Sequence, residues 1–238
     1  MLKKRSRVSG RPGPQPSHFA ALAAEMRRDK LPELEHFVVS STITCTNDLS
    51  TTGSGCLNLI AQGVKTEERD GRNIEVTSVK MQGLAKLSGD TDAAPFTLPS
   101  FEIVRMFLVY DKAPNGAAPT LANIFRTPDA GGVAGWLREP LYYSRFEVLA
   151  EDEVVLRPHI AQSHDDPLDV ISWTTCKEPF KFVWKGKKLV SYKGSGATIG
   201  DINTGAFWIV CGQSGNVHAI EVQMQTHIRY RSVGTWKV

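Results

Sequence analysis

The residues best placed to do chemistry are lysines and arginines near the start of the chain. Residues 1–30 hold eight of them against two acidic residues, a net charge of 8 − 2 = +6, which leaves 3 − 6 = −3 for the remaining residues. A basic tail on a near-neutral body is typical of proteins that bind a polyanion through its phosphates. The predicted nucleic-acid-binding residues are Lys3, Lys4, Arg5, Arg7, Arg11, Arg27, Arg28 and Lys30.

The tail divides into two parts. Residues 1–16 combine five basic residues with three prolines and two glycines, so we expect them to be disordered when free. After an N-cap at Ser17, residues 18–30 have the alanines and the basic end of a short helix, which Pro32 ends. This helix either offers its basic turn to phosphates or packs as an ordinary solvated helix. The Lys3–Arg7 cluster is also compatible with a nuclear-import signal, which an import receptor would bind.

Patterns that resemble catalytic or metal-binding motifs fail on spacing. GQSGN at 212–216 has its second glycine one position too early for a nucleophile elbow. GSGATIGD at 194–201 lacks the third glycine and the following helix of a phosphate loop, so we interpret it as a surface loop. The candidate metal ligands, bracketed by prolines in a loop, are His159, His164, Asp165 and Asp166. Their spacing is not that of a helical metal site, and we expect no enzyme activity, no metal and no cofactor.

The cysteines and the hydropathy indicate a protein of a reducing compartment without a membrane partner. Cys45, Cys56, Cys176 and Cys211 form no CxxC pair, and charged residues follow closely on Met1 where a signal peptide would be apolar. We therefore interpret the four as small buried thiols. No run approaches the ~20 apolar residues that a membrane span requires.

The body of the chain is organised around residues 101–126. Ile103–Tyr110 is apolar except at Arg105, which predicts a strand buried on both faces in the middle of a sheet. Residues 114–116 then supply a tight turn. We expect Arg105 to be a paired structural charge or an interface residue. The residues that should bring the next segment back onto the core are Leu121, Ile124 and Phe125.

The rest of the body is a succession of predicted strands. They cover residues 37–45, 56–61, 74–87, 142–149, 153–158, 180–184, 188–192, 207–211 and 220–231. An acidic turn is expected at Glu151 and Asp152, and a break between strands at Gly186. Alternation changes phase near Thr77 and Ser78, which predicts a bulge there. In 220–231 it is unbroken, which predicts one core face and one wet face. The fold class is therefore all-β: a single eight-stranded antiparallel jelly-roll sandwich at residues 35–238, with a basic N-terminal arm, residues 1–34, that contains the short helix.

Several landmarks along the body resemble a known family. LNLIAQG, the loop with Glu68, Arg69, Gly71 and Arg72, then VRMFLVYDKAPNGAAPTLANIF and YYSRFEVLAEDEVVL follow one another in a recognisable order and spacing. They resemble the single-jelly-roll capsid proteins of small circular Rep-encoding single-stranded DNA (CRESS-DNA) viruses, and they are similar to the capsid protein of satellite tobacco necrosis virus. The resemblance covers most of residues 56–156 and, more loosely, the C-terminal strands.

This resemblance implies a coat protein that self-assembles into a small icosahedral T=1 shell around a single-stranded genome, with the basic arm facing inward. It implies the virion as location, with the host nucleus during assembly, and it favours DNA over RNA without excluding either. It offers no catalytic residue. If about 60 copies assemble, the arms bring about 360 positive charges, and their binding to phosphates should be non-specific and salt-dependent.

Two other classes of protein remain open. A cellular jelly-roll binding module such as a lectin would share the sandwich but would not need the basic arm. A non-specific single-stranded nucleic-acid-binding protein would place stacking aromatics beside its cations, whereas the wet face of 220–231 has His227, Arg229 and Arg231 and no aromatic. Trp136, Trp173 and Trp236 are candidates either for interface anchors or for core and capping positions.

Overall fold

The computed structural model describes residues 34–45, 54–65, 67–87, 101–126, 137–157, 159–161, 170–172, 177–214 and 220–233. All of them belong to one unit of the chain, Leu34–Val238. Within these residues, no helix has the length and apolar character to cross a membrane. Several predictions fall outside the described residues: the eight basic site residues and the helix of the arm, the three tryptophans named above, Cys176, His164, Asp165, Asp166, and the side chain of His159.

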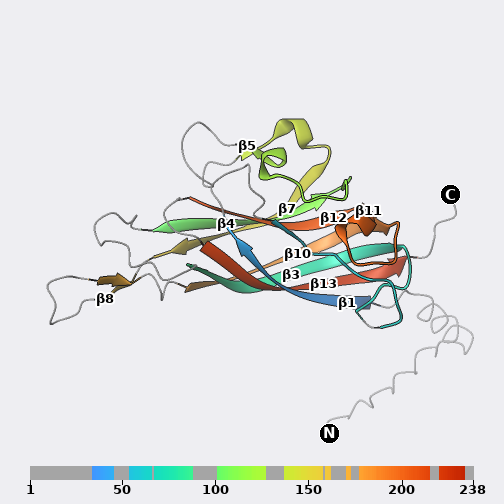
Figure 1. Cartoon of the computed structure of the whole chain (residues 1–238), viewed down its shortest axis with the longest axis horizontal. Helices are drawn as coiled ribbons and strands as arrows, with labels where there is room; N and C mark the ends of the chain where they lie inside the picture. Colours follow the sequence, from blue (N-terminus) through green and yellow to red (C-terminus); the bar gives the residue numbers. More distant parts are fainter. Residues whose placement is uncertain are drawn as a thin grey trace, which may run out of the picture. The chain divides into compact units, whose positions relative to one another are not determined.

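Two antiparallel sheets form a β-sandwich (Figure 1). The five-stranded sheet has the order β1 (Leu34–Thr44), β13 (Ile220–Val233), β3 (Asn73–Leu87), β10 (Lys177–Tyr192) and β11 (Ile202–Thr204). The four-stranded sheet has the order β2 (Ser54–Cys56), β12 (Ala206–Gln213), β4 (Glu102–Asp111) and β7 (Phe146–Leu156). The connections hold two ribbons, β5 (Phe125–Arg126) with β6 (Leu137–Arg138) and β8 (His159–Ala161) with β9 (Val170–Ser172), and three 3-10 turns, η1 (Leu121–Asn123), η3 (Pro140–Tyr142) and η4 (Ile199–Asp201).

The all-β, antiparallel character is confirmed, and the described residues hold thirteen strands rather than eight. Without the edge strand β11, the two sheets contain eight principal strands: β1, β2, β3, β4, β7, β10, β12 and β13. Short strands in the connections add to the count, while predicted strands merge. The expected turn at Glu151 and Asp152 is part of the continuous strand β7, where Glu151 pairs with Arg105 of β4. The expected break at Gly186 is a bulge within β10. The predicted strand 56–61 ends at Cys56.

The predicted bulge in β3 is confirmed at Thr77. In the pairing with β13, Ser78 lies opposite Arg229 and Val76 opposite Tyr230, so Thr77 has no partner. Pairing with β10 skips the same residue. Side chains beyond the bulge therefore change face, as an inserted residue requires in a structure of period two.

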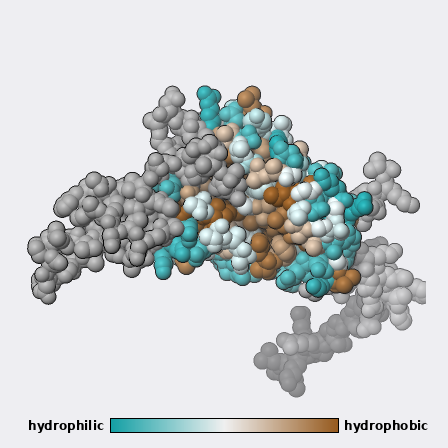
Figure 2. All heavy atoms as spheres, viewed as in Figure 1, coloured by the Kyte–Doolittle hydropathy of each residue, from teal (hydrophilic) through white to brown (hydrophobic). Residues whose placement is uncertain are grey.

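The strands of the two sheets differ in burial. Strand β13 alternates as predicted, with Ile220, Val222, Met224, Thr226, Ile228 and Tyr230 buried. Strand β12 is buried at every position, and β4 lies between β12 and β7 as predicted, buried from Met106 to Asp111. Leu121, Ile124 and Phe125 are buried in the core cluster, also as predicted, and the ring of Phe125 lies 4.5 Å from that of Phe107. Figure 2 shows hydrophobic residues in the middle of the viewed face and mainly hydrophilic ones along its right-hand side.

Candidate nucleic-acid interface

The outer face of the five-stranded sheet brings together cations from three strands that are distant in sequence. Strand register aligns the outward-facing residues of β1, β13, β3 and β10 in rows. The first three rows are His36, Arg229, Ser78 and Lys185; then Val38, His227, Lys80 and Val183; then Ser40, Gln225, Gln82 and Lys181. We call Lys80, Lys181, Lys185 and Arg229, with His36 and His227, the cationic face.

These three rows contain no carboxylate, so the cationic face carries a formal charge of at least +4. Among the residues that the structure describes, none of these three lysines and one arginine forms an ion pair within 4.0 Å. Carboxylates occur at the two ends of the same face, where Glu75 lies 3.9 Å from Lys187 and Glu221 lies 3.4 Å from Lys86. The positive charge is therefore concentrated in the middle of the sheet.

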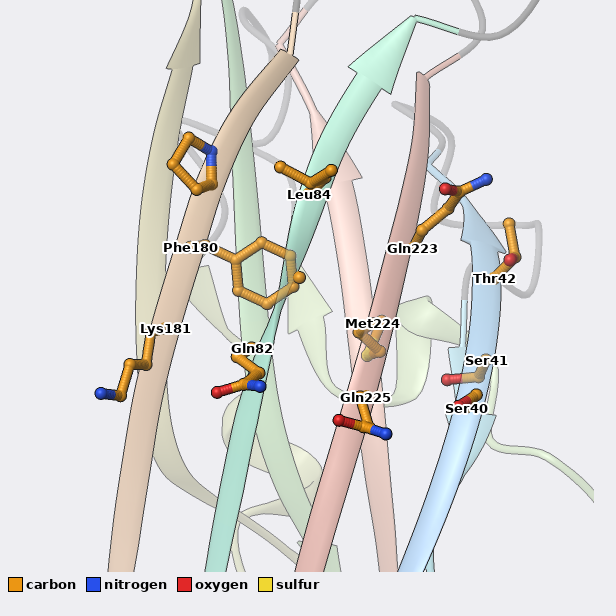
Figure 3. A pocket seen from close by; sticks show the side chains of 12 residues that line it. Ser40, Ser41, Thr42, Gln82, Leu84, Phe180, Lys181, Gln223, Met224 and Gln225 are labelled. Atoms are coloured by element: carbon orange, nitrogen blue, oxygen red, sulfur yellow. The ribbon is translucent and has the colours of Figure 1, made fainter.

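Two shallow hollows lie along this face. The first, of about 660 Å³, is lined by five members of the cationic face, and Glu35 at its rim accepts a hydrogen bond from Ser232 at 2.7 Å. The second, of about 760 Å³, is lined by residues of the same four strands, β1, β3, β10 and β13. Half of its lining residues are serine, threonine or glutamine, and most of the others are apolar. Figure 3 shows Lys181, Gln82, Gln225 and Ser40 abreast across four strands.

The bulge at Thr77 is what turns Lys80 and Gln82 outward. Before the bulge, the buried residues of β3 are Ile74 and Val76; after it they are Val79, Met81 and Ala85. Without the extra residue, Lys80 would fall on the core side, because a shift of one position exchanges the two faces of a strand. The hydroxyl of Thr77 donates to the carbonyl of Arg229 at 3.1 Å, which ties the bulge to β13.

Arg69, one of the family landmarks, is a structural residue rather than a ligand-binding one. It is fully buried, and its guanidinium donates to the carbonyls of Ile60, Gly71 and Gly194. The same group lies 4.0 Å from the ring centre of Tyr192. Burial lowers the pKa of the Arg69 guanidinium, because desolvation disfavours its charge. Arg69 therefore joins two connections at the end of the sandwich and is not available to a phosphate.

Two further landmarks pair with each other. Asp111 ends β4 and is fully buried, and both of its carboxylate oxygens accept hydrogen bonds of 2.8 Å from Arg145, just before β7. The hydrogen bond with Asp111 raises the pKa of the Arg145 guanidinium, which stays charged. Arg105 is likewise paired, with Glu151 and Glu153, which confirms it as a structural charge. The landmarks thus fix strands β4 and β7 against one another.

An apolar turn stands out on the connection between β4 and β7. In the segment Pro140–Tyr143, the exposed fractions of Leu141, Tyr142 and Tyr143 are 81%, 39% and 50%. The side chain of Glu139 accepts a hydrogen bond from the amide of Leu141 at 3.3 Å, which holds the turn. Residues 142–149 were predicted to form a strand, and this turn was not predicted. Contiguous exposed apolar side chains of this kind are typical of protein contact sites.

The glycine-rich segment 194–201 is a surface loop, as interpreted from sequence. The carboxylate of Asp201 accepts hydrogen bonds from the amide and the hydroxyl of Thr198, and these lower its pKa. A Cβ at Gly194 or Gly196 would clash with that carboxylate. An anion already fills the loop, so a phosphate would be repelled.

The described residues offer neither a metal-binding cluster nor a reactive thiol. Within them, no group of three or more His, Cys, Asp and Glu side chains is arranged to hold a metal ion. Cys45 and Cys211 are buried free thiols, and Cys56 is half-buried with its pKa raised by burial to about 12. A thiol with so high a pKa is a poor nucleophile at neutral pH.

Comparison with known proteins does not identify the chain. No protein-family model and no curated protein matches it. Solved structures that align include a pilus of Bacillus endospore appendages (9% identity, 96% of this chain and 100% of that chain, TM-score 0.23). A second is Desmodium yellow mottle tymovirus (9% identity, 99% of this chain and 96% of that chain, TM-score 0.21). A third is VP1 of Trichodysplasia spinulosa-associated polyomavirus in complex with sialylated glycooligomers (9% identity, 83% of this chain and 93% of that chain, TM-score 0.21). These identities and TM-scores are too low to assign a function.

Proposed function

We propose that the chain is a viral coat protein whose copies assemble into a small icosahedral shell around a single-stranded genome. The observation that carries this proposal is the pairing of the eight principal strands. The first pairs with the last (β1 with β13), the second with the seventh (β2 with β12), the third with the sixth (β3 with β10) and the fourth with the fifth (β4 with β7). This nested pairing is that of a jelly roll, a fold that viral capsids share with lectins and cupins.

Among viral capsid proteins, lectins and cupins, the landmark residues favour a viral capsid protein. Arg69, Asp111 and Arg145 belong to segments whose order resembles coat proteins, and each holds connections or strand ends of the sandwich in place. Because the fold alone does not fix function, the basic arm supplies the second line of support. A sandwich with internally satisfied sheets leaves its loops for contacts between subunits.

Self-assembly would use exposed apolar surface, and the Pro140–Tyr143 turn offers it. Leucine and tyrosine side chains at such a position can act as anchors when a second copy covers them. The eight cations of the arm would hold the genome without sequence specificity, and we favour DNA over RNA. A virion, formed in the host nucleus after import through the Lys3–Arg7 cluster, is the corresponding location.

Neutralising the arm tests this function. In the full-length chain, the eight basic residues of the arm are replaced by Gln, and the control carries Lys65→Gln, Lys112→Gln and Lys187→Gln, three exposed lysines of the body. Particles are collected by sedimentation, and the nucleic acid that survives external nuclease is quantified and digested with DNase or RNase. We expect the arm variant to form particles with several-fold less protected nucleic acid, because counterion release drives binding. Equal protection in arm variant and wild type would contradict the proposal.

A further inference from the structure

We propose that the cationic face of the five-stranded sheet is a second binding surface for single-stranded nucleic acid, separate from the arm. Three consecutive rows carry Lys80, Lys181, Lys185 and Arg229 without a carboxylate, and His36 and His227 lie among them. This site goes beyond the proposed function, which assigns genome binding to the arm alone.

The dimensions of the face suit a short stretch of a nucleic-acid strand. Same-face residues repeat every ~6.7 Å along a strand and neighbouring strands lie ~4.8 Å apart, so three rows on four strands cover roughly 13 by 14 Å. This length corresponds to about four nucleotides at the ~3.4 Å spacing along one strand of a duplex, and to fewer in an extended strand. The four unpaired cations therefore match a few successive phosphates.

The neighbouring row of amides favours a nucleic acid over other polyanions. Gln82, Gln225 and Ser40 lie beside Lys181 on the second hollow, with Thr42 and Gln223 beyond them (Figure 3). Amide and hydroxyl side chains can donate to and accept from base edges, which an unpaired strand leaves accessible. A sulfated polysaccharide would use the cations but has no bases for this row. Phosphates would thus lie along the first hollow and beside Lys181, and bases would lie in the rest of the second hollow.

The composition of the face argues against a contact between copies of the chain. Lysine is depleted from protein interfaces, because its ammonium is strongly hydrated and its removal from water is costly. Three of the four unpaired cations here are lysines, and the three rows that hold them supply no carboxylate with which the same rows of a second copy could neutralise them. A polyanion satisfies all four at once.

Salt-dependent binding tests the inference. The face variant carries Lys80→Gln, Lys181→Gln, Lys185→Gln and Arg229→Gln in the full-length chain, and the matched control carries Lys86→Gln and Lys187→Gln, lysines of the same face that lie near carboxylates. Fluorescence anisotropy follows a labelled oligothymidylate of roughly 20 nucleotides, long enough for several such sites. The slope of log K against log salt should fall in magnitude by up to about 2.8, since each lost phosphate contact is worth ~0.7. The control slope should stay close to wild type.

A variant without any change of charge distinguishes the contribution of the second hollow to binding from that of the first. Gln82→Ala with Gln225→Ala should weaken binding several-fold and leave the salt slope unchanged, because no cation is removed. Thermal melting and circular dichroism of each variant show whether the sandwich is intact. An intact face variant with wild-type slope and affinity overturns the inference. The inference is also overturned if the face variant no longer binds a heparin oligosaccharide but still binds oligothymidylate as wild type does.

The outcome is independent of the test of the arm. If the arm variant packages little nucleic acid and the face variant keeps the wild-type slope, the proposed function stands and the second surface is refuted. If the face variant loses slope while the arm variant packages as much as wild type, the second surface stands and the assignment of the arm is refuted.

Discussion

The two sheets of the sandwich differ in what covers their outer faces. In the five-stranded sheet, β13 alternates between buried and accessible residues, so its outer side is open in the described part of the chain. In the four-stranded sheet, every residue of β12 is buried, and the connection from β4 to β7 packs Phe125 on Phe107 of the neighbouring strand β4. Among the described residues, the chain thus uses one of its own connections to cover one sheet and places none over the unpaired cations of the other.

Polar residues follow the same division. On the covered side, Asp111 is fully buried and is held by Arg145 in a two-point ion pair. On the open side, Glu75 and Lys187 lie 3.9 Å apart, and the lysine side chain is 77% exposed. Charges on the covered side are therefore expected to stabilise the fold, and charges on the open side to serve binding.

The largest expected effect comes from removing the covering ring. Phe125→Ala should lower the free energy of unfolding by about 4 kcal/mol, because it loses buried aromatic surface and leaves a cavity above Phe107. Leu84→Ala, at a residue of the open face that is 40% exposed, should cost less than about 1 kcal/mol. Urea denaturation followed by tryptophan fluorescence measures both. Equal losses of unfolding free energy in the two variants would contradict the difference in burial between the two outer faces.

A smaller effect is expected from the ion pairs. Asp111→Ala should lower the free energy of unfolding by about 3 kcal/mol, since it leaves the half-buried guanidinium of Arg145 without its partner. Glu75→Ala should change it by less than about 1 kcal/mol, because the pair with Lys187 is largely solvated. Differential scanning calorimetry measures the melting temperature of both variants. A larger decrease for Glu75→Ala than for Asp111→Ala would contradict this prediction.

Local patterns in the sequence were enough for part of the fold. The alternation of 220–231, the buried strand at Ile103–Tyr110 and the bulge at Thr77 could all be predicted, because each depends only on residues close in sequence. Strand β7 could not, since Glu151 and Asp152 were interpreted as a turn although no Gly, Pro or Asn accompanies them. In the structure the carboxylate of Glu151 meets Arg105 at 3.2 Å, so an acidic pair is tolerated within a strand.

The cationic face could be predicted only in part. Arg229 and His227 were identified on the wet side of one strand, but Lys80 and Lys185 come from β3 and β10, and only the register between strands brings the four together. The pattern of one segment shows which of its residues share a face, but not which distant strand lies beside it. Arg69 and Asp111 were noticed as landmarks, yet their structural roles depend on carbonyls and a partner far along the chain.

The central claim is that a jelly-roll body assembles with copies of itself around nucleic acid. Sedimentation velocity of the purified full-length protein, with electron microscopy of the fastest fraction, tests it most directly. The account predicts closed particles of uniform size, many times heavier than the 26.2 kDa chain, that contain nuclease-protected single-stranded nucleic acid. A species of 26.2 kDa at every ionic strength, with no nucleic acid bound, would contradict it.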